Sequence, residues 1–187
     1  MTNSIDCNFS QFGEGPGLFL IHGIGAARDA WRFIIPKLSK YFTVITYDLR
    51  GHGKSLLTKK NFNFEDLIED LESIRKKTNI EKAHFVGHWL GGMIAPAYAK
   101  KFPDNTISVG LLSTVAGRTL EEKNKIFDII KKMEIKGIPK TLPTLKSRWF
   151  TDNFIKENPS IVERRIKQVI NTNPEVFLNV FRIYAET

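Results

Sequence analysis

The sequence contains a single cysteine, Cys7, among its 187 residues, so no disulfide can form within the chain. A chain that does not use disulfides fits a reducing compartment, and a cytoplasmic location is expected. No apolar run approaches the ~20 residues that a membrane-spanning helix needs. Residues 1–15 are polar and lack the charged-then-apolar pattern of a secretory leader. We therefore expect a protein without disulfides and without a membrane partner.

Histidine is also scarce, and the spacing of the four histidines is not that of a metal site. None of His22, His52, His84 and His88 belongs to an H-E-x-x-H pair. We therefore expect no metal and no cofactor. The net charge of +8 comes from lysines spread along surface-type positions, with no nucleic-acid motif beside them. We expect no nucleic-acid partner either.

What the chain does contain is an alternation of short apolar segments and helical patterns. Its 42% hydrophobic residues are enough for a sizeable core. Apolar segments typical of buried strands lie at 18–21, 42–47, 83–86 and 107–112. Helical patterns lie at 29–39, 63–77 and 93–100, and residues 5–12 are expected to form an edge hairpin strand. This alternation predicts a mostly parallel sheet with helices on both faces.

The pattern changes after Leu112. Apolar residues at helical spacing predict helices at about 120–133, 161–170 and 174–184, and no further strand is expected. Asn173 and Pro174 are suitable cap and first-turn residues for the last of these helices. We therefore expect a sheet domain at residues 1–116 and a helical lid at residues 117–187.

The central motif is Val86–Gly92, which reads Val-Gly-His-Trp-Leu-Gly-Gly. It stands between an apolar segment and a helix of small residues, which is the setting of the G-x-S-x-G nucleophile elbow. Gly87 and Gly91 occupy the two glycine positions, and Trp89 occupies the serine position. An indole N–H is only a hydrogen-bond donor. The sequence therefore predicts a nucleophile turn that lacks its reacting atom.

Two further segments follow predicted strands. His22-Gly23-Ile24-Gly25 comes after the first, and residues 48–55 come after the second. Ligands of parallel sheets bind at the carboxyl ends of the strands, so these segments and Trp89 are expected to share one rim. Asp48 and Arg50 are expected to fix their loop by hydrogen bonds and an ion pair, and His52 is expected to stabilise it.

These three segments, at these spacings, resemble those of the α/β-hydrolases. The aromatic stretch Trp149-Phe150, with Phe154, is similar to the lid of 3-oxoadipate enol-lactonases and small esterases. The resemblance implies a three-layer α/β/α fold with a helical lid, here without the family's last two strand–helix units. It also implies binding of a small ester or lactone by an oxyanion hole and a substrate pocket. The backbone N–H groups of Ile24 and Leu90 would form the hole, and His22, Gly23, Trp149 and Phe150 would contact the substrate.

The sequence departs from this family in its catalytic residues. The family's order is serine, then an acid, then histidine, whereas Trp89 replaces the serine and the four histidines precede or flank it. The expected function is that of an ester or lactone hydrolase lineage, inactive or impaired in this chain because Trp89 replaces the nucleophile and the family's acid and base are absent. The alternative is a non-catalytic ligand-binding or regulatory module, in which Trp89 fills the pocket or stacks on a ligand. In the family's sheet order, the apolar strand at 107–112 would become an edge, so self-association through it is expected.

Overall fold

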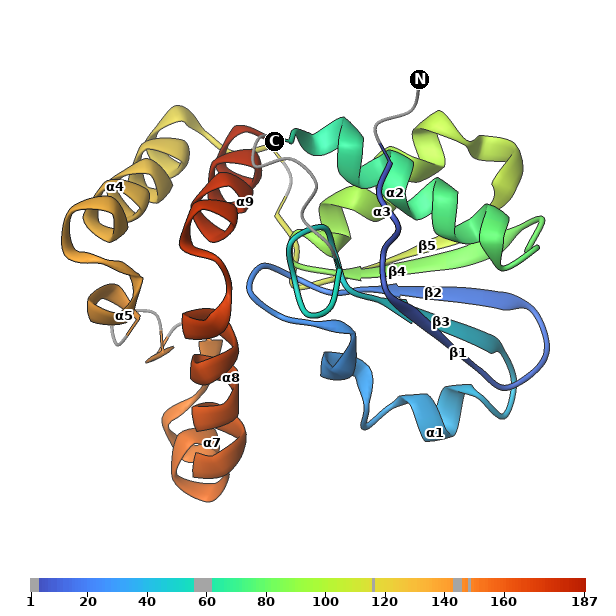
Figure 1. Cartoon of the computed structure of the whole chain (residues 1–187), viewed down its shortest axis with the longest axis horizontal. Helices are drawn as coiled ribbons and strands as arrows, with labels where there is room; N and C mark the ends of the chain where they lie inside the picture. The colour runs from blue at the N-terminus through green and yellow to red at the C-terminus, as the bar shows by residue number, and fades with distance from the viewer. Residues whose placement is uncertain (1–3, 56–61, 116, 143–145, 148) are drawn as a thin grey trace. The chain divides into compact units, whose positions relative to one another are not determined.

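The structure is a computed structural model that describes residues 4–55, 62–115, 117–142, 146–147 and 149–187. The chain forms two compact units, Met1–Gly117 and Arg118–Glu186. The first unit contains one five-stranded sheet (Figure 1). Its strands are β1 (Phe9–Phe12), β2 (Gly17–Ile21), β3 (Thr43–Tyr47), β4 (Ala83–His88) and β5 (Thr106–Leu112).

The strand order is β1-β3-β2-β4-β5, and the four strands from β3 to β5 run parallel. Every residue of β2 is buried, as expected of a central strand that is covered on both faces. The predicted edge hairpin at residues 5–12 is wrong in part. Only residues 9–12 form a strand, and they pair antiparallel with β3 rather than with β2. Because β2 has a parallel neighbour on each side, β1 adds at the outer edge of β3.

At the other end of the sheet, β5 pairs with β4 and is the last strand among the described residues. Three of its apolar side chains are exposed: Ile107 by 51%, Leu111 by 53% and Leu112 by 44%. Self-association through this strand stays a prediction.

The helical segments of the first unit lie on both faces of the sheet, with α2 and α3 on one face and α1 on the other (Figure 1). They are η1 (Arg28–Trp31), α1 (Ile35–Leu38), α2 (Phe64–Lys77), α3 (Gly91–Lys101) and η2 (Pro103–Asn105). On the α1 face, Trp31 packs with Leu18, Leu20 and Val44 in a buried cluster.

Helix α2 begins at the residue that the sequence predicts. The Asn63 side chain accepts a hydrogen bond from the Asp66 N–H at 3.1 Å, and the Asp66 carboxylate accepts one from the Asn63 N–H at 2.9 Å. This reciprocal capping box satisfies two N–H groups that a helix start would otherwise leave unpaired.

The single helix predicted at 29–39 is wrong. The structure has a 3₁₀ turn and then the short helix α1, which carries Pro36 in its first turn. Proline has no N–H to continue a preceding helix, so a new helix starts there instead. Trp31 is buried, whereas Ile34 is 39% exposed.

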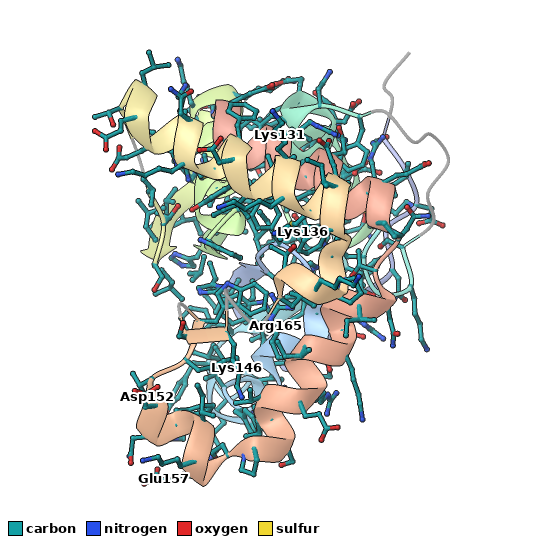
Figure 2. The ribbon with its side chains drawn as sticks, turned by 90° about the vertical axis from the view of Figure 1, so that its left-hand side faces the viewer. Lys131, Lys136, Lys146, Asp152, Glu157 and Arg165 are labelled. Carbon is teal, nitrogen blue, oxygen red and sulfur yellow. The ribbon has the colours of Figure 1, made fainter. Side chains whose placement is uncertain are left out.

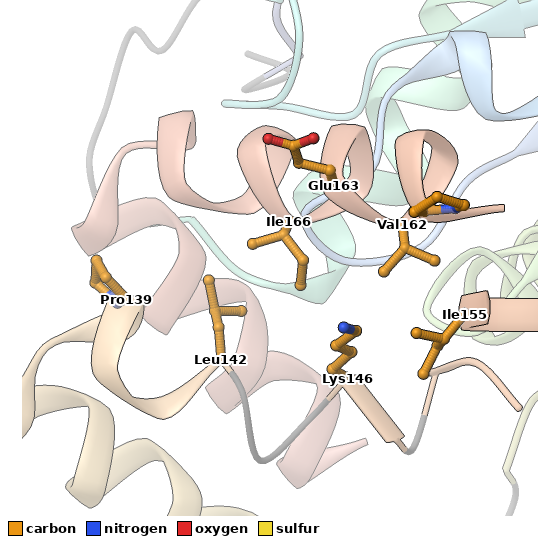
Figure 3. Close-up of a pocket in the computed structure, with 8 residues that line it drawn as sticks. Pro139, Leu142, Lys146, Ile155, Val162, Glu163 and Ile166 are labelled. Atoms are coloured by element: carbon orange, nitrogen blue, oxygen red, sulfur yellow. The ribbon is translucent and has the colours of Figure 1, made fainter. Parts of the chain in front are cut away.

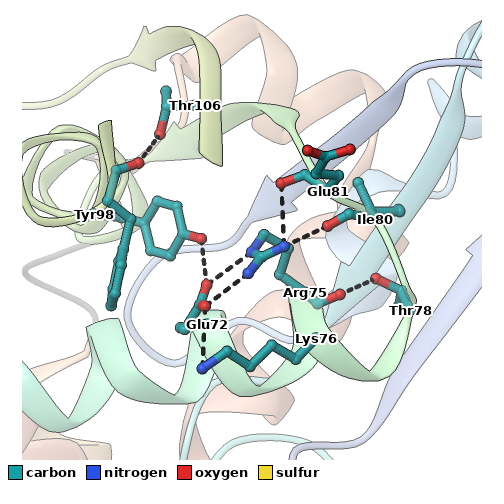
Figure 4. Close-up of polar contacts among 9 residues, drawn as sticks. Glu72, Arg75, Lys76, Thr78, Ile80, Glu81, Tyr98 and Thr106 are labelled. Atoms are coloured by element: carbon teal, nitrogen blue, oxygen red, sulfur yellow. Dashed lines mark hydrogen bonds and ion pairs between the residues drawn. The ribbon is translucent and has the colours of Figure 1, made fainter. Parts of the chain in front are cut away.

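A buried carboxylate connects α2 to α3 (Figure 4). Glu72, on α2, accepts two hydrogen bonds from the Arg75 guanidinium, both at 2.8 Å, and one from the Tyr98 hydroxyl of α3 at 2.6 Å. The same guanidinium donates to the Ile80 carbonyl ahead of β4. Burial alone would raise the pKa of Glu72, but the hydrogen bonds from Arg75 and Tyr98 hold this pKa below its ordinary value.

We expect Glu72→Gln to lower the free energy of unfolding by about 1–3 kcal/mol at neutral pH, because it removes the charge that these donors face. A carboxyl group whose pKa is lowered by folding stabilises the protein above its unfolded pKa. That contribution is lost as the pH falls through the folded pKa. The difference between the two proteins in urea unfolding should therefore shrink below about pH 4. A difference that does not change between neutral and acid pH would contradict this assignment.

Within its described residues, the second unit consists of helices: α4 (Leu120–Lys136), α5 (Ile138–Thr141), α7 (Asp152–Glu157), α8 (Pro159–Asn171) and α9 (Pro174–Glu186). Thr119 and Glu122 form a capping box at α4, and the Asn173 side chain accepts two N–H groups at the start of α9. Helix α4 packs on α9, with Ile130 and Met133 buried. Phe127, three residues before Ile130 on the same helix, is 37% exposed.

Exposed charges of both signs lie on this unit. Lys131 and Lys136 extend from α4, whereas Asp152 and Glu157 lie on α7 (Figure 2). No helix in the described part of the chain is both long and apolar enough to cross a membrane.

Candidate functional site

The turn between β4 and α3 has the strand–turn–helix geometry that the motif predicts. Strand β4 ends at His88, Trp89 has a φ of +57°, and Leu90 precedes the first residue of α3. A bulky residue in this left-handed region costs of order 1–3 kcal/mol, and the surrounding structure must stabilise it. Trp89 therefore occupies the strained tip of the turn.

The glycines around Trp89 are required by the close approach of strand and helix. A Cβ atom at Gly87 would lie 1.9 Å from the Gly91 carbonyl oxygen. A Cβ atom at Gly91 would lie 2.1 Å from the Ile21 carbonyl oxygen of β2. Both distances are much shorter than a van der Waals contact, and the atoms met are backbone atoms. No side chain therefore fits at either position.

The backbone of Trp89 is connected to the segment at the end of β5. Its N–H donates to the Leu112 carbonyl at 3.0 Å, and its carbonyl accepts from the Thr114 hydroxyl at 2.9 Å. A Cβ atom at Gly92 would lie 2.6 Å from the Cβ atom of Thr114, so Thr114 also packs against the start of α3. The sequence does not identify Thr114 as a residue of this site, because the only signal for it is its position just after β5.

The structure brings the turn at residues 22–25 against the Trp89 turn. A Cβ atom at Gly23 would lie 3.0 Å from the Cβ atom of Trp89. The side chains of Ile24 and Leu90, the two predicted oxyanion-hole positions, are completely buried. Within the part of the chain that the structure describes, the N–H of Leu90 donates no hydrogen bond.

Both ring nitrogens of His22 form hydrogen bonds, and so do both ring nitrogens of His52. His22 Nε2 accepts the Leu49 N–H at 2.9 Å, so its proton is on Nδ1, which donates to the Gly23 carbonyl at 2.8 Å. His52 Nε2 accepts the Gly25 N–H at 3.0 Å, and its Nδ1 donates to the Arg50 carbonyl. Both neutral rings therefore stabilise the backbone of this rim.

Asp48 organises the loop that follows β3. Its carboxylate accepts the N–H groups of Arg28 and Lys54 at 2.8 and 3.0 Å and the Asn8 amide at 2.8 Å. Asp48 and Arg50 each form an ion pair, but not with one another. Asp48 pairs with Arg28 at 3.8 Å, and Arg50 pairs with Asp70 on α2 at 2.8 Å. Nothing in the local sequence indicates that partner.

Cys7 is buried in the same unit. Burial raises the pKa of its thiol, so the thiol stays protonated and is a poor nucleophile at neutral pH.

The other two predicted substrate residues belong to the second unit. The Arg165 guanidinium lies over the Trp149 ring, 4.9 Å from its centre, and Phe150 stacks on Phe154 with 5.4 Å between ring centres. Both residues are half-buried. In neither unit do the described residues include a cluster of three or more side chains that could bind a metal ion.

Comparisons with known proteins extend these observations. A family model described as the alpha/beta hydrolase fold matches residues 16–141. An uncharacterised protein of Mycobacterium tuberculosis is 31% identical over 144 residues, which cover 74% of this chain and 42% of that protein. The 3-oxoadipate enol-lactonase 1 of Acinetobacter baylyi is 26% identical over 174 residues, which cover 92% of this chain and 64% of the lactonase. The chain thus spans less than two thirds of the length of these relatives.

Solved structures share the backbone arrangement. An esterase from Thermogutta terrifontis superposes with a TM-score of 0.87 at 24% identity, covering 97% of this chain and 68% of the esterase. An enol-lactonase from Burkholderia xenovorans LB400 also gives 0.87 at 24% identity, covering 96% of this chain and 70% of the lactonase. At this identity, the likeness establishes a common fold.

Proposed function

Since this chain belongs to the α/β-hydrolase fold family, we propose that it derives from an ester or lactone hydrolase and that Trp89 prevents acyl transfer. The observation that carries the proposal is the indole at the tip of the turn, where φ is +57° and glycines lie two residues away on each side. Acyl transfer needs an oxygen or sulfur nucleophile at this position, and indole supplies neither. The ester and lactone hydrolases among the relatives support the substrate class.

The proposal assigns the remaining predicted residues to binding. The N–H groups of Ile24 and Leu90 would donate to a substrate oxygen, and the absence of a described partner for the Leu90 N–H supports its assignment. His22 and Gly23 would border the same position. Trp149 and Phe150, in a helical unit that acts as a lid, would contact the rest of a small ester or lactone.

A second candidate function is ligand binding without catalysis. It is favoured by the Trp89 backbone, which keeps its strained conformation and its two hydrogen bonds although the indole carries no nucleophilic atom. The half-buried indole would then offer a flat face to a ligand.

Hydrolysis of p-nitrophenyl butyrate tests the first proposal. We expect no turnover by the unmodified chain above a heat-denatured control, because loss of the nucleophile alone costs on the order of 10⁶-fold in a serine hydrolase. Trp89→Ser and Trp89→Ala form a matched pair that differs only in the hydroxyl group. Turnover by Trp89→Ser and not by Trp89→Ala would support the nucleophile position. Steady turnover by the unmodified chain would overturn the proposal.

Thermal unfolding of the unmodified chain with a series of small lactones separates the two candidates. A ligand that binds only the folded state raises the midpoint in a concentration-dependent way. A shift without turnover would favour the binding module, whereas an unchanged midpoint would count against it.

A further inference from the structure

The second unit contains a cavity of about 400 Å³ bounded by α5, α7 and α8 (Figure 3). Its walls are apolar, and they come from segments far apart in the sequence. They are formed by Pro139, Leu142, Ile155, Pro159, Val162 and Ile166. All of these residues lie between 118 and 186, so the cavity belongs to this unit alone. Its volume is at the small end of the range of ligand pockets.

Two charged residues also border the cavity, and their situations differ. Glu163 forms an ion pair with Lys167, one helical turn away, at 3.0 Å. Its carboxylate is directed away from the Lys146 ammonium, which extends among the apolar side chains toward α8 (Figure 3). Among the residues that the structure describes, Lys146 has no acidic partner. The cavity therefore offers an apolar wall and one cation.

We propose that this cavity binds a small amphipathic carboxylate, with its apolar tail against Leu142, Val162 and Ile166 and its carboxylate on the Lys146 ammonium. At the ~30 Å³ that a water molecule occupies in the liquid, the volume accommodates roughly a dozen non-hydrogen atoms. An uncharged apolar occupant would displace water from the Lys146 ammonium without replacing the hydrogen bonds of that water, which is unfavourable. A carboxylate supplies a charge-assisted hydrogen bond there. This site goes beyond the proposed function, because it needs no residue of the first unit.

Three probes with the same tail and different head groups test the site: octanoate, octan-1-ol and octylammonium. Binding is followed by NMR of the full chain with labelled isoleucine methyl groups. We expect octanoate to shift the methyl signals of Ile155 and Ile166, with affinity at least about tenfold above that of octan-1-ol and no binding of octylammonium. Equal affinity for octanoate and octan-1-ol would overturn the role of the cation. Shifts confined to isoleucines of the first unit would overturn the site.

Lys146→Met and Lys156→Met provide a matched pair of variants. Both remove one lysine charge, but Lys156 is exposed on α7 and does not border the cavity. We expect only Lys146→Met to weaken octanoate binding, by about tenfold, and to leave octan-1-ol binding unchanged. An equal loss in both variants would show attraction to the overall positive charge and would contradict the proposal. No loss in either would exclude Lys146 as the carboxylate partner.

Discussion

Gly91→Ala should lower the free energy of unfolding by about 3–5 kcal/mol or prevent folding of the first unit. The added Cβ atom would lie 2.1 Å from the Ile21 carbonyl oxygen, 2.7 Å from the Ile21 carbonyl carbon and 2.9 Å from the His22 carbonyl oxygen. These are backbone atoms at the carboxyl end of β2, the middle strand of the sheet, so they cannot move aside as a side chain would. The loss is a large fraction of the ~5–15 kcal/mol that stabilises a typical domain.

The matched control is Gly117→Ala. Gly117 has a φ of +68°, and a Cβ atom there would meet no atom within 4 Å. Its replacement should cost only the ~1–2 kcal/mol of a left-handed alanine. Urea unfolding followed by circular dichroism compares the two variants. If Gly91→Ala costs no more than Gly117→Ala, the close approach of α3 to β2 is wrong.

Gly91 also shows why the central turn was predictable from the sequence. Gly87, Trp89 and Gly91 are neighbours along the chain, so the motif is visible in the sequence. The steric requirement at Gly87 is also local, because a Cβ atom there would meet the Gly91 carbonyl oxygen, whereas the requirement at Gly91 comes from the distant strand β2. The start of α2 at Asn63 was predictable for the same reason, because its capping box spans only four residues. Buried strands such as β2 were found from their wholly apolar composition.

What the sequence did not reveal depends on contacts between distant segments. Residues 9–12 have a strand pattern, but the choice of β3 over β2 as their partner follows from the completed sheet. The apolar pattern of residues 29–39 is continuous and therefore predicted one helix. The structure instead breaks between η1 and α1, because Pro36 has no N–H to donate to a preceding helical turn. Thr114 supports Trp89 across 25 residues of sequence, a relation that no short motif contains.

The pairing of Arg50 with Asp70 is a second long-range contact of this kind, and it carries the other large expected effect. The Arg50 guanidinium donates from Nε and Nη2 to the two Asp70 oxygens at 2.9 and 2.8 Å, and the Ile5 N–H donates to the same carboxylate at 2.8 Å. Both side chains are only 1% exposed. The carboxylate therefore connects the N-terminal segment, the loop after β3 and α2.

We expect Asp70→Asn to lower the free energy of unfolding by about 3–5 kcal/mol, because it leaves the buried Arg50 guanidinium without its counter-charge. Glu163→Gln is the control, since it removes one carboxylate from an exposed pair with Lys167 and should change stability by no more than about 1 kcal/mol. Urea unfolding at neutral pH measures both variants.

The double variant Arg50→Met/Asp70→Leu separates the destabilisation by an unpaired buried charge from the net contribution of the ion pair to the free energy of unfolding. Apolar residues of similar volume often replace a buried ion pair with little loss, so the double variant should recover most of the stability that Asp70→Asn loses. A double variant as unstable as Asp70→Asn would instead show that the hydrogen bond from Ile5 and the bidentate geometry stabilise this part of the fold. A loss below about 1 kcal/mol in Asp70→Asn itself would mean that water reaches the guanidinium, and the buried pair would then be wrong.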